Sequence, residues 1–135
     1  MDTERIESEL KSFFATTPGD AVAVYLYGSV ARGTAREDSD VDVGVLLEKE
    51  PPRTLKGLKL DLEADLESLL EVPVQLVVLN RAPPDLIHRV LRDGKLVLDR
   101  DRSKRIRFEV KARNEFFDLQ PILRQYRRSP APRSA

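Results

Sequence analysis

Two short apolar segments separated by a polar spacer constrain the fold of this chain more than any other feature. Residues 21–27 and 41–47 are rich in β-branched residues and bounded by turn residues, so both are predicted strands. Gly28-Ser29 follows the first strand, and after ten further residues Asp40-Val41-Asp42 opens the second. Because side chains alternate faces along a strand, Asp40 and Asp42 should lie on one face, about 6 to 7 Å apart. Two carboxylates facing a Gly-Ser turn predict a site for a divalent cation and a phosphate chain.

Length and composition limit the scaffold and the metals that such a site could hold. The chain has 135 residues, 41% hydrophobic and 34% charged, which suits one globular domain with one core. No apolar stretch approaches the length of a membrane span, and the charged start of the chain does not look like a secretion signal, so a cytoplasmic protein is expected. There is no cysteine and His88 is the only histidine, so a metal here would be one that prefers oxygen ligands, such as Mg²⁺ or Mn²⁺.

Periodicity and turn residues predict the remaining elements, and together they indicate one α/β (α+β) domain at residues 1–128 with a disordered tail at 129–135. We expect a first helix that carries Ile6, Leu10, Phe13 and Phe14 and ends near Pro18, and a short helical turn within 30–39. After the second strand we expect a helix with leucines at 55, 58, 62, 66 and 69, a strand at 72–79, a helix from Pro84 to Gly94 and a short strand at 95–98. The chain should end in a helical segment at 101–128, in which Pro121 forces a kink or restart. His88 lies off the apolar stripe of its helix, so we expect it to face solvent or a partner and assign it no role.

The C-terminal segment is basic although the whole chain is neutral. Residues 100–135 carry eleven Lys or Arg against four Asp or Glu, while the chain as a whole has 23 of each class. A basic end can mark an acidic partner or nucleic acid. A solvated helix face followed by a loose tail would produce the same composition.

Several phosphate and cation motifs do not fit the Gly-Ser and Asp-x-Asp segments. No lysine follows Gly28-Ser29, which excludes a P-loop, and the glycine spacing differs from that of a dinucleotide fingerprint. A calcium loop starting at Asp38 would need glycine where Val43 stands and glutamate where Lys49 stands. Acidic residues beside strands can also be plain decoration of a solvent-facing edge.

The combination of these features resembles the nucleotidyltransferase superfamily that includes DNA polymerase β. The form Gly-Ser-Val-Ala-Arg-Gly at 28–33 and the stretches at 79–84, 90–94 and 116–119 narrow the resemblance to the minimal nucleotidyltransferases, antitoxins paired with a HEPN-domain ribonuclease toxin. The resemblance implies the polymerase β-like fold, a small mixed sheet of three to four strands flanked by helices. It further implies transfer of AMP from ATP to a tyrosine of the HEPN toxin, with no membrane and no direct nucleic acid as partner.

The resemblance assigns roles to five residues of this signature. Asp40 and Asp42 would hold Mg²⁺ (or Mn²⁺) and act in catalysis. Gly28 would let the backbone approach the triphosphate of ATP, and Ser29 would add a hydroxyl donor. Arg32 could steady phosphate charge; Arg36 is a weaker candidate of the same kind, because it lies outside the matched segment.

One position departs from the family pattern. A third carboxylate usually stands on the neighbouring strand, and here the matching residue is Gln75, which brings no charge and cannot act as a general base. Two aspartates could suffice for slow transfer, or the chain could be a catalytically weak or inactive antitoxin that neutralises its toxin by binding. A transferase acting on a small compound such as an aminoglycoside is a third reading, and it predicts a deep acceptor pocket lined with acids.

Overall fold

The computed structural model describes residues 2–16, 21–49 and 55–128, with the side chains of 55–56 and 123–128 excepted. The elements, in chain order, are α1 (Thr3–Thr16), β1 (Ala21–Tyr27), α2 (Gly28–Arg32), β2 (Val41–Leu47), α3 (Leu55–Leu70), β3 (Val74–Val78), the 3₁₀ turn η1 (Leu79–Arg81), α4 (Pro84–Asp93), β4 (Lys95–Asp99) and α5 (Arg102–Arg128). Both predicted strands that flank the Gly-Ser and Asp-x-Asp segments are confirmed with the expected bounds.

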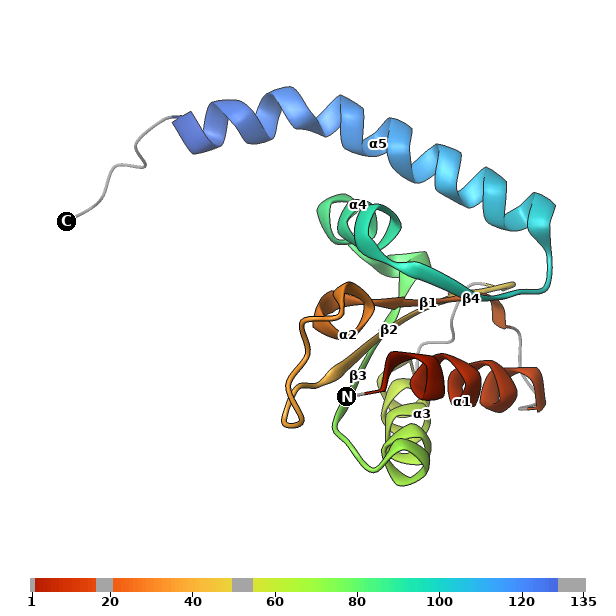
Figure 1. The fold of residues 1–135 in the computed structure, drawn as a ribbon. Coiled ribbons are helices and arrows are strands. Elements are labelled where there is room, and N and C mark those ends of the chain that lie inside the picture. The colour runs from red at the N-terminus through yellow and green to blue at the C-terminus, as the bar shows by residue number, and fades with distance from the viewer. Residues whose placement is uncertain (1, 17–20, 50–54, 129–135) are drawn as a thin grey trace.

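The four strands form one mixed sheet with the order β3-β2-β1-β4 (Figure 1). β1 pairs antiparallel with β2 on one side and with β4 on the other, whereas β2 and β3 are parallel. The parallel pair is joined by α3, because parallel neighbours need a long crossover. The predicted small mixed sheet of three to four strands flanked by helices is therefore confirmed.

Helices cover both faces of the sheet, with α1 and α3 on one face and α4 and α5 on the other (Figure 1). On the α1 and α3 face, the odd-numbered valines of β2 pack with Leu10 and Leu66. On the opposite face, Tyr25 and Tyr27 pack with residues of α4 such as Val90. Because β1 is buried on both faces, it is a continuous apolar run and not an alternating one.

The alternation of β2 and β3 determines which face carries the polar residues. Val41, Val43 and Val45 point into the α1 and α3 core. Asp42 therefore belongs to the opposite face, which is the face covered by α4. The same parity puts Gln75 on that face, since Val74 and Leu76 lie in the other core.

The free edge of β3 is protected by side chains of α3. Glu67 accepts a hydrogen bond from the Val74 main-chain N–H at 3.0 Å, and Glu63 accepts one from the Leu76 N–H at 2.8 Å. These N–H groups belong to an edge strand and would otherwise be open to pairing with another chain. The carboxylates of α3 thus close this side of the sheet.

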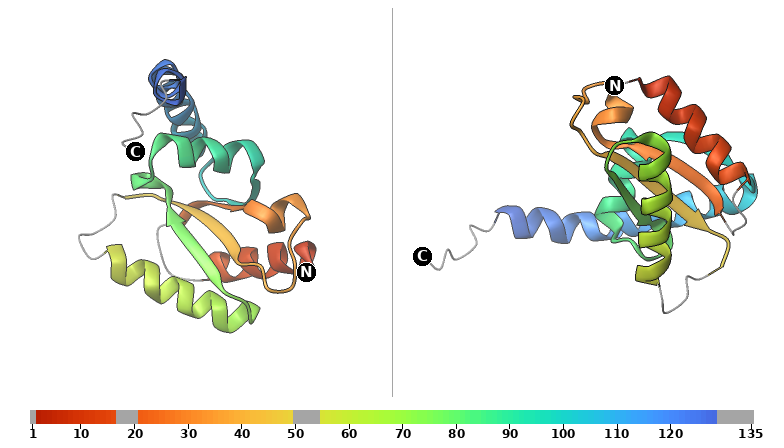
Figure 2. Two further views of the ribbon diagram at one scale, coloured as in Figure 1. Left: turned by 90° about the vertical axis from the view of Figure 1, so that its left-hand side faces the viewer. Right: turned by 90° about the horizontal axis from the view of Figure 1, so that it is seen from below.

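The first half of α5 is fastened to the sheet by a polar network. The Tyr25 hydroxyl donates to Glu109 Oε2 at 2.6 Å, and Arg105 donates to Asp99 at 2.8 Å and to Glu109 at 3.0 Å. The Lys104 ammonium also donates to the main-chain carbonyl of Glu48. Farther along, α5 extends past α4 and away from the rest of the molecule (Figure 2).

Three predictions about elements need correction, and one is not tested. The short helix after β1 begins at Gly28 itself, not within 30–39, and the third strand is 74–78, shorter than predicted. α5 continues through Pro121, so no restart occurs. Proline removes one helical N–H, and the carbonyl of exposed Phe117 that would have accepted it can be solvated by water. The tail predicted at 129–135 lies outside the described residues.

Within the described residues, no helix combines the length and the apolar character needed to cross a bilayer.

Candidate functional site

The turn from β1 into α2 is shaped by a close approach between Gly28 and Asp42. Gly28 has φ of 76°, a left-handed conformation that residues with a Cβ rarely adopt. A Cβ at this position would stand 2.2 Å from Asp42 Oδ2. Glycine is therefore required on two counts, backbone conformation and space. The Asp42 carboxylate is held directly against the Gly-Ser turn.

Asp42 stands between β1 and β3 in the centre of this site. Its Cα partner on β1 is Tyr27, and its Cα partner on β3 is Gln75. The Gln75 side chain donates from Nε2 to Asp40 Oδ2 at 3.1 Å. The parallel register thus brings together Asp40, Asp42 and Gln75, which the sequence had placed at the matching positions of the signature.

Charge and burial raise the pKa of the Asp42 carboxyl. Burial is the largest cause, and the nearby Asp40 carboxylate acts in the same direction. Arg32 and Arg89 act in the opposite direction and lower the pKa of Asp42. Two half-buried carboxylates that repel each other form a site in which a bound cation would be stabilised.

The other residues singled out in the sequence differ in how closely they approach this centre. Arg32 is exposed at the end of α2, and its charge reaches both Asp42 and Asp93. Ser29 is half-buried in the first turn of α2, where its main-chain carbonyl accepts a hydrogen bond from the Thr34 N–H at 3.0 Å. Arg36 is exposed in the loop before β2 and is not among the charges that shift Asp42.

Two residues near the site were not found from the sequence. Tyr27 is buried, and burial together with Asp42 raises the pKa of its hydroxyl, while Arg89 lowers that pKa. The position of Tyr27 directly before Gly28 could have identified it as a site residue, because the last strand residue before a turn lies next to whatever the turn binds. Arg89 had no such signal, since the orientation of α4 over α2 depends on long-range packing.

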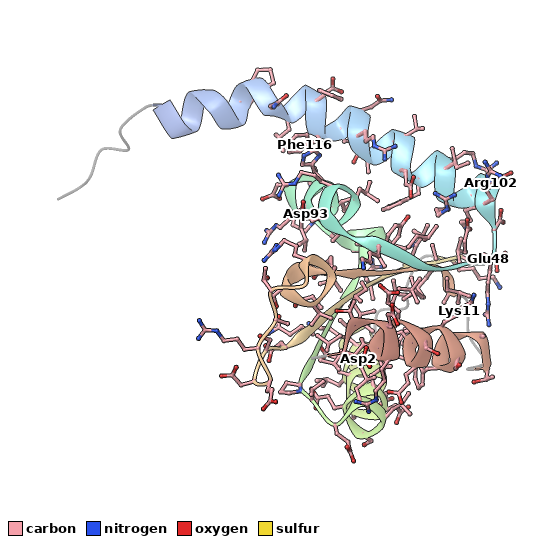
Figure 3. All side chains as sticks on the ribbon, viewed as in Figure 1. Asp2, Lys11, Glu48, Asp93, Arg102 and Phe116 are labelled. Carbon is pink, nitrogen blue, oxygen red and sulfur yellow. The ribbon has the colours of Figure 1, made fainter. Side chains whose placement is uncertain are left out.

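The prediction that His88 faces solvent or a partner missed a contact with α5. His88 is half-buried and stacks on Phe116 of α5, with ring centroids 3.8 Å apart and an interplanar angle of 2°. The helical stripe of α4 correctly identified its buried residues, Ile87 and Val90. The stripe could not show that α5 would pass over α4 and place Phe116 against this histidine; Figure 3 shows Phe116 on the side of α5 that faces α4.

The donor set suits a hard cation but has one charge fewer than a complete carboxylate triad. Among the residues that the structure describes, no group of three or more His, Cys, Asp or Glu is arranged to hold a metal ion. Asp40 and Asp42 provide carboxylate oxygens, and Gln75 can add only a neutral amide oxygen. Oxygen donors of this kind match the preferences of Mg²⁺ and Mn²⁺.

Comparison with known proteins agrees with this geometry. Residues 8–103 match the family described as polymerase beta, nucleotidyltransferase. Over 68 residues the chain is 43% identical to the protein adenylyltransferase MntA of Thermococcus cleftensis. This match covers 50% of this chain and 66% of that protein. The matched part is thus just under two thirds of the length of this curated relative.

Solved structures show the same fold over nearly the whole chain. A toxin-antitoxin crystal structure with AMP-PNP is 24% identical, with a TM-score of 0.72, and the match covers 89% of this chain and 97% of that chain. The MNT antitoxin structure in complex with the tri-AMPylated HEPN toxin of Shewanella oneidensis is 22% identical, with a TM-score of 0.67, covering 93% and 98% of the two chains. At these identities the likeness concerns the fold. The family match over 8–103, together with an Asp-x-Asp strand beside a Gly-Ser turn, shows that the chain belongs to the polymerase beta nucleotidyltransferase family.

Proposed function

We propose that this chain is an antitoxin that transfers AMP from ATP to a tyrosine of a HEPN-domain toxin. The observation that carries the proposal is the Asp42 carboxylate, held against Gly28 and beside Asp40 in a member of the nucleotidyltransferase family. The similarity to a protein adenylyltransferase and to antitoxins solved with their toxins supports the protein acceptor. We place this activity in the cytoplasm, because ATP and the RNA that a ribonuclease toxin attacks are found there.

Asp40 and Asp42 would hold the divalent cation of the reaction. Their oxygen donors fit Mg²⁺ or Mn²⁺, and burial together with the Asp40 carboxylate raises the pKa of Asp42, an effect that a bound cation would oppose. When bound, such a cation neutralises phosphate charge and orients the α-phosphorus for in-line attack. The nucleotide would be held by the main chain at Gly28, the hydroxyl of Ser29 and the charge of Arg32.

Gln75 stands where a third carboxylate would act as the general base of the transfer. In the transfer, the tyrosine oxygen bonds to the α-phosphorus, the bond to the bridging oxygen breaks, pyrophosphate leaves, and the phenol proton passes to a base. A glutamine cannot accept that proton, and general-base help is commonly worth about 10² to 10⁴ in rate. Gln75 instead donates to Asp40 and orients its carboxylate. We therefore expect slow transfer.

The same residue supports a second candidate function, neutralisation of the toxin by binding alone. The amide of Gln75 donates to Asp40 and so stabilises one of the two carboxylates when no cation is bound. A small-molecule transferase acting on aminoglycosides is less well supported. The cavity of about 410 Å³ beside α4 is lined by Arg89 and Arg92 with a single carboxylate, Asp85, which suits an anion better than a polycation.

The deciding experiment is incubation of the purified chain with α-labelled ATP, Mg²⁺ and a HEPN-domain toxin. We expect label on the toxin and loss of its ribonuclease activity, with both effects abolished by Asp42→Asn. Asp38→Asn is the matched control, because Asp38 is exposed in the loop that precedes β2 and lies outside the strand register. An unlabelled but fully inhibited toxin would instead establish the binding-only antitoxin.

A further inference from the structure

α4 and the second half of α5 enclose a groove that the proposed chemistry does not use. The two helices meet through the stacked rings of His88 and Phe116. Cavities of about 410 Å³ and about 300 Å³ flank this pair, and both are bounded by Arg92 and Phe117. We call this region the α4–α5 groove. Figure 3 shows Phe116 on the underside of α5, directed toward α4.

The groove combines cationic side chains with an aromatic surface. Arg89 lines one cavity and Arg113 lines the other, and the stacked rings line both. Phe117 stands in both cavities and is 66% exposed, an unusual exposure for a large apolar side chain. An apolar platform between two arginines is suited to a ligand that has both apolar and anionic groups.

The arginines differ in how far they are already neutralised. Arg92 makes two hydrogen bonds of 2.9 Å to Asp93, so its charge is largely satisfied. Arg113 approaches Glu109 only at 3.9 Å, beyond hydrogen-bond distance. Arg89 forms no ion pair with any carboxylate among the described residues. Arg89 and Arg113 are thus the cations available to an incoming ligand.

Arg89 connects the groove to the candidate active site. It lines the larger cavity, and its helix α4 packs against both α2 and β1, with Val90 beside Arg89 in the same buried cluster as Tyr27. A ligand that lies in the groove and passes Arg89 therefore arrives beside the strand residues that would hold the nucleotide.

We propose that the α4–α5 groove binds an acidic segment of the acceptor protein and directs its tyrosine to the nucleotide. The proposal rests on the proposed function, which makes the acceptor a protein. Carboxylates of the segment would pair with Arg89 and Arg113, and an apolar side chain would cover Phe117. Single-stranded RNA also binds arginines and aromatic rings. It suits the groove less well, because a phosphate at every nucleotide would bring one close to Asp85, whereas a peptide can place its acids opposite the arginines only.

Fluorescence anisotropy with three labelled probes tests this proposal. The probes are a tyrosine peptide flanked by glutamates, the same peptide with glutamines, and an RNA oligonucleotide. We expect the glutamate peptide to bind tightest, with an affinity that falls as salt rises. Arg113→Ala should weaken its binding by about tenfold, the effect of losing one charge-assisted contact. Arg107→Ala is the matched control, because Arg107 is exposed on α5 but lines neither cavity.

Kinetics with the HEPN toxin provide a second readout that a loss of folding would not imitate. Arg113→Ala should raise the KM for the toxin and leave the KM for ATP unchanged, since Arg113 lies away from the nucleotide residues. The proposal is overturned if the two peptides bind equally, if RNA binds and the glutamate peptide does not, if no peptide binds at about 1 mM, or if Arg107→Ala has the same effect. Absence of AMP transfer by the unmodified chain, with groove binding intact, would reject only the proposed function.

Discussion

Replacing Gly28 by alanine is the sharpest perturbation that the structure offers. The new Cβ would stand 2.2 Å from Asp42 Oδ2, whereas Cβ atoms essentially never come closer than 3.0 Å to a neighbour. The carboxylate must therefore retreat by about 0.8 Å. A displacement of about 1 Å in a catalytic group can cost on the order of 10² in rate. We expect Gly28→Ala to lose Mg²⁺-ATP binding and about two orders of magnitude in AMP transfer.

Gly33 provides a matched control at the other end of the same short helix. Its φ is 75°, nearly identical to the 76° of Gly28, yet a Cβ there would meet nothing within 4 Å. The backbone penalty of placing an alanine in the left-handed region is roughly 1–2 kcal/mol in both variants. Both should therefore unfold at similar, slightly lowered urea concentrations. Only Gly28→Ala should change the site.

The assay is isothermal titration of Mg²⁺-ATP, combined with urea unfolding of the unmodified chain and both variants. Equal nucleotide affinity in Gly28→Ala and Gly33→Ala would refute the assignment of Asp42 to the nucleotide site. A much larger loss of stability in Gly28→Ala than in Gly33→Ala would show that the collision is relieved by the backbone and not by the carboxylate. In either case the close approach would not have the functional role proposed for it.

Three further perturbations test other parts of the molecule. Gln75→Glu should destabilise the chain in the absence of Mg²⁺, because it sets a third carboxylate beside Asp40. The same substitution should raise the Mg²⁺ affinity and the rate of AMP transfer. A titration that shows no gain in Mg²⁺ affinity would contradict the interpretation that the site has only two carboxylates. Burial and the hydrogen bond to Glu109 raise the pKa of Tyr25, so stability is intact below the unfolded tyrosine pKa near 10 and is lost above it. Tyr25→Phe should therefore make the decline in unfolding free energy between about pH 10.5 and 12 shallower by up to about 1.4 kcal/mol per pH unit, and an unchanged slope would argue against a buried, protonated Tyr25. Asn80→Ala removes the side-chain hydrogen bonds of 2.8 and 2.9 Å to the main chain of Leu47. It should therefore lower the unfolding free energy, measured by urea titration, by about 2 kcal/mol. A change under about 0.5 kcal/mol would mean that water replaces both bonds.

The strands beside the site could be predicted because their signals are local. β1 is a continuous apolar run and β2 is apolar apart from Asp42, both are bounded by turn residues, and their bounds were predicted correctly. The Asp2 cap of α1 is another local feature, since its carboxylate accepts from the Arg5 N–H at 3.2 Å. Parity along a strand then places Asp40, Asp42 and Gln75 on one face once β2 and β3 are neighbours.

Predictions that depended on contacts between distant elements were less successful. His88 was expected to face solvent or a partner, and its stacking on Phe116 of α5 was not foreseen. Pro121 was expected to kink or restart the last helix; no restart occurs, because α5 continues through it. In both cases the local pattern was read correctly, and the outcome depended on an element far away in the chain or on solvent access.

The sequence by itself determined the class of fold, the strands and the residues of the Gly-Ser and Asp-x-Asp signature, because turn chemistry and a two-residue period act within a few residues. Only the tertiary structure decided that Gly28 lies in contact with Asp42, that Gln75 donates to Asp40, and that Arg89 reaches the site from α4. These contacts depend on strand register and on how helices pack across the sheet. Both are set by the summed burial of many side chains, which no local motif records.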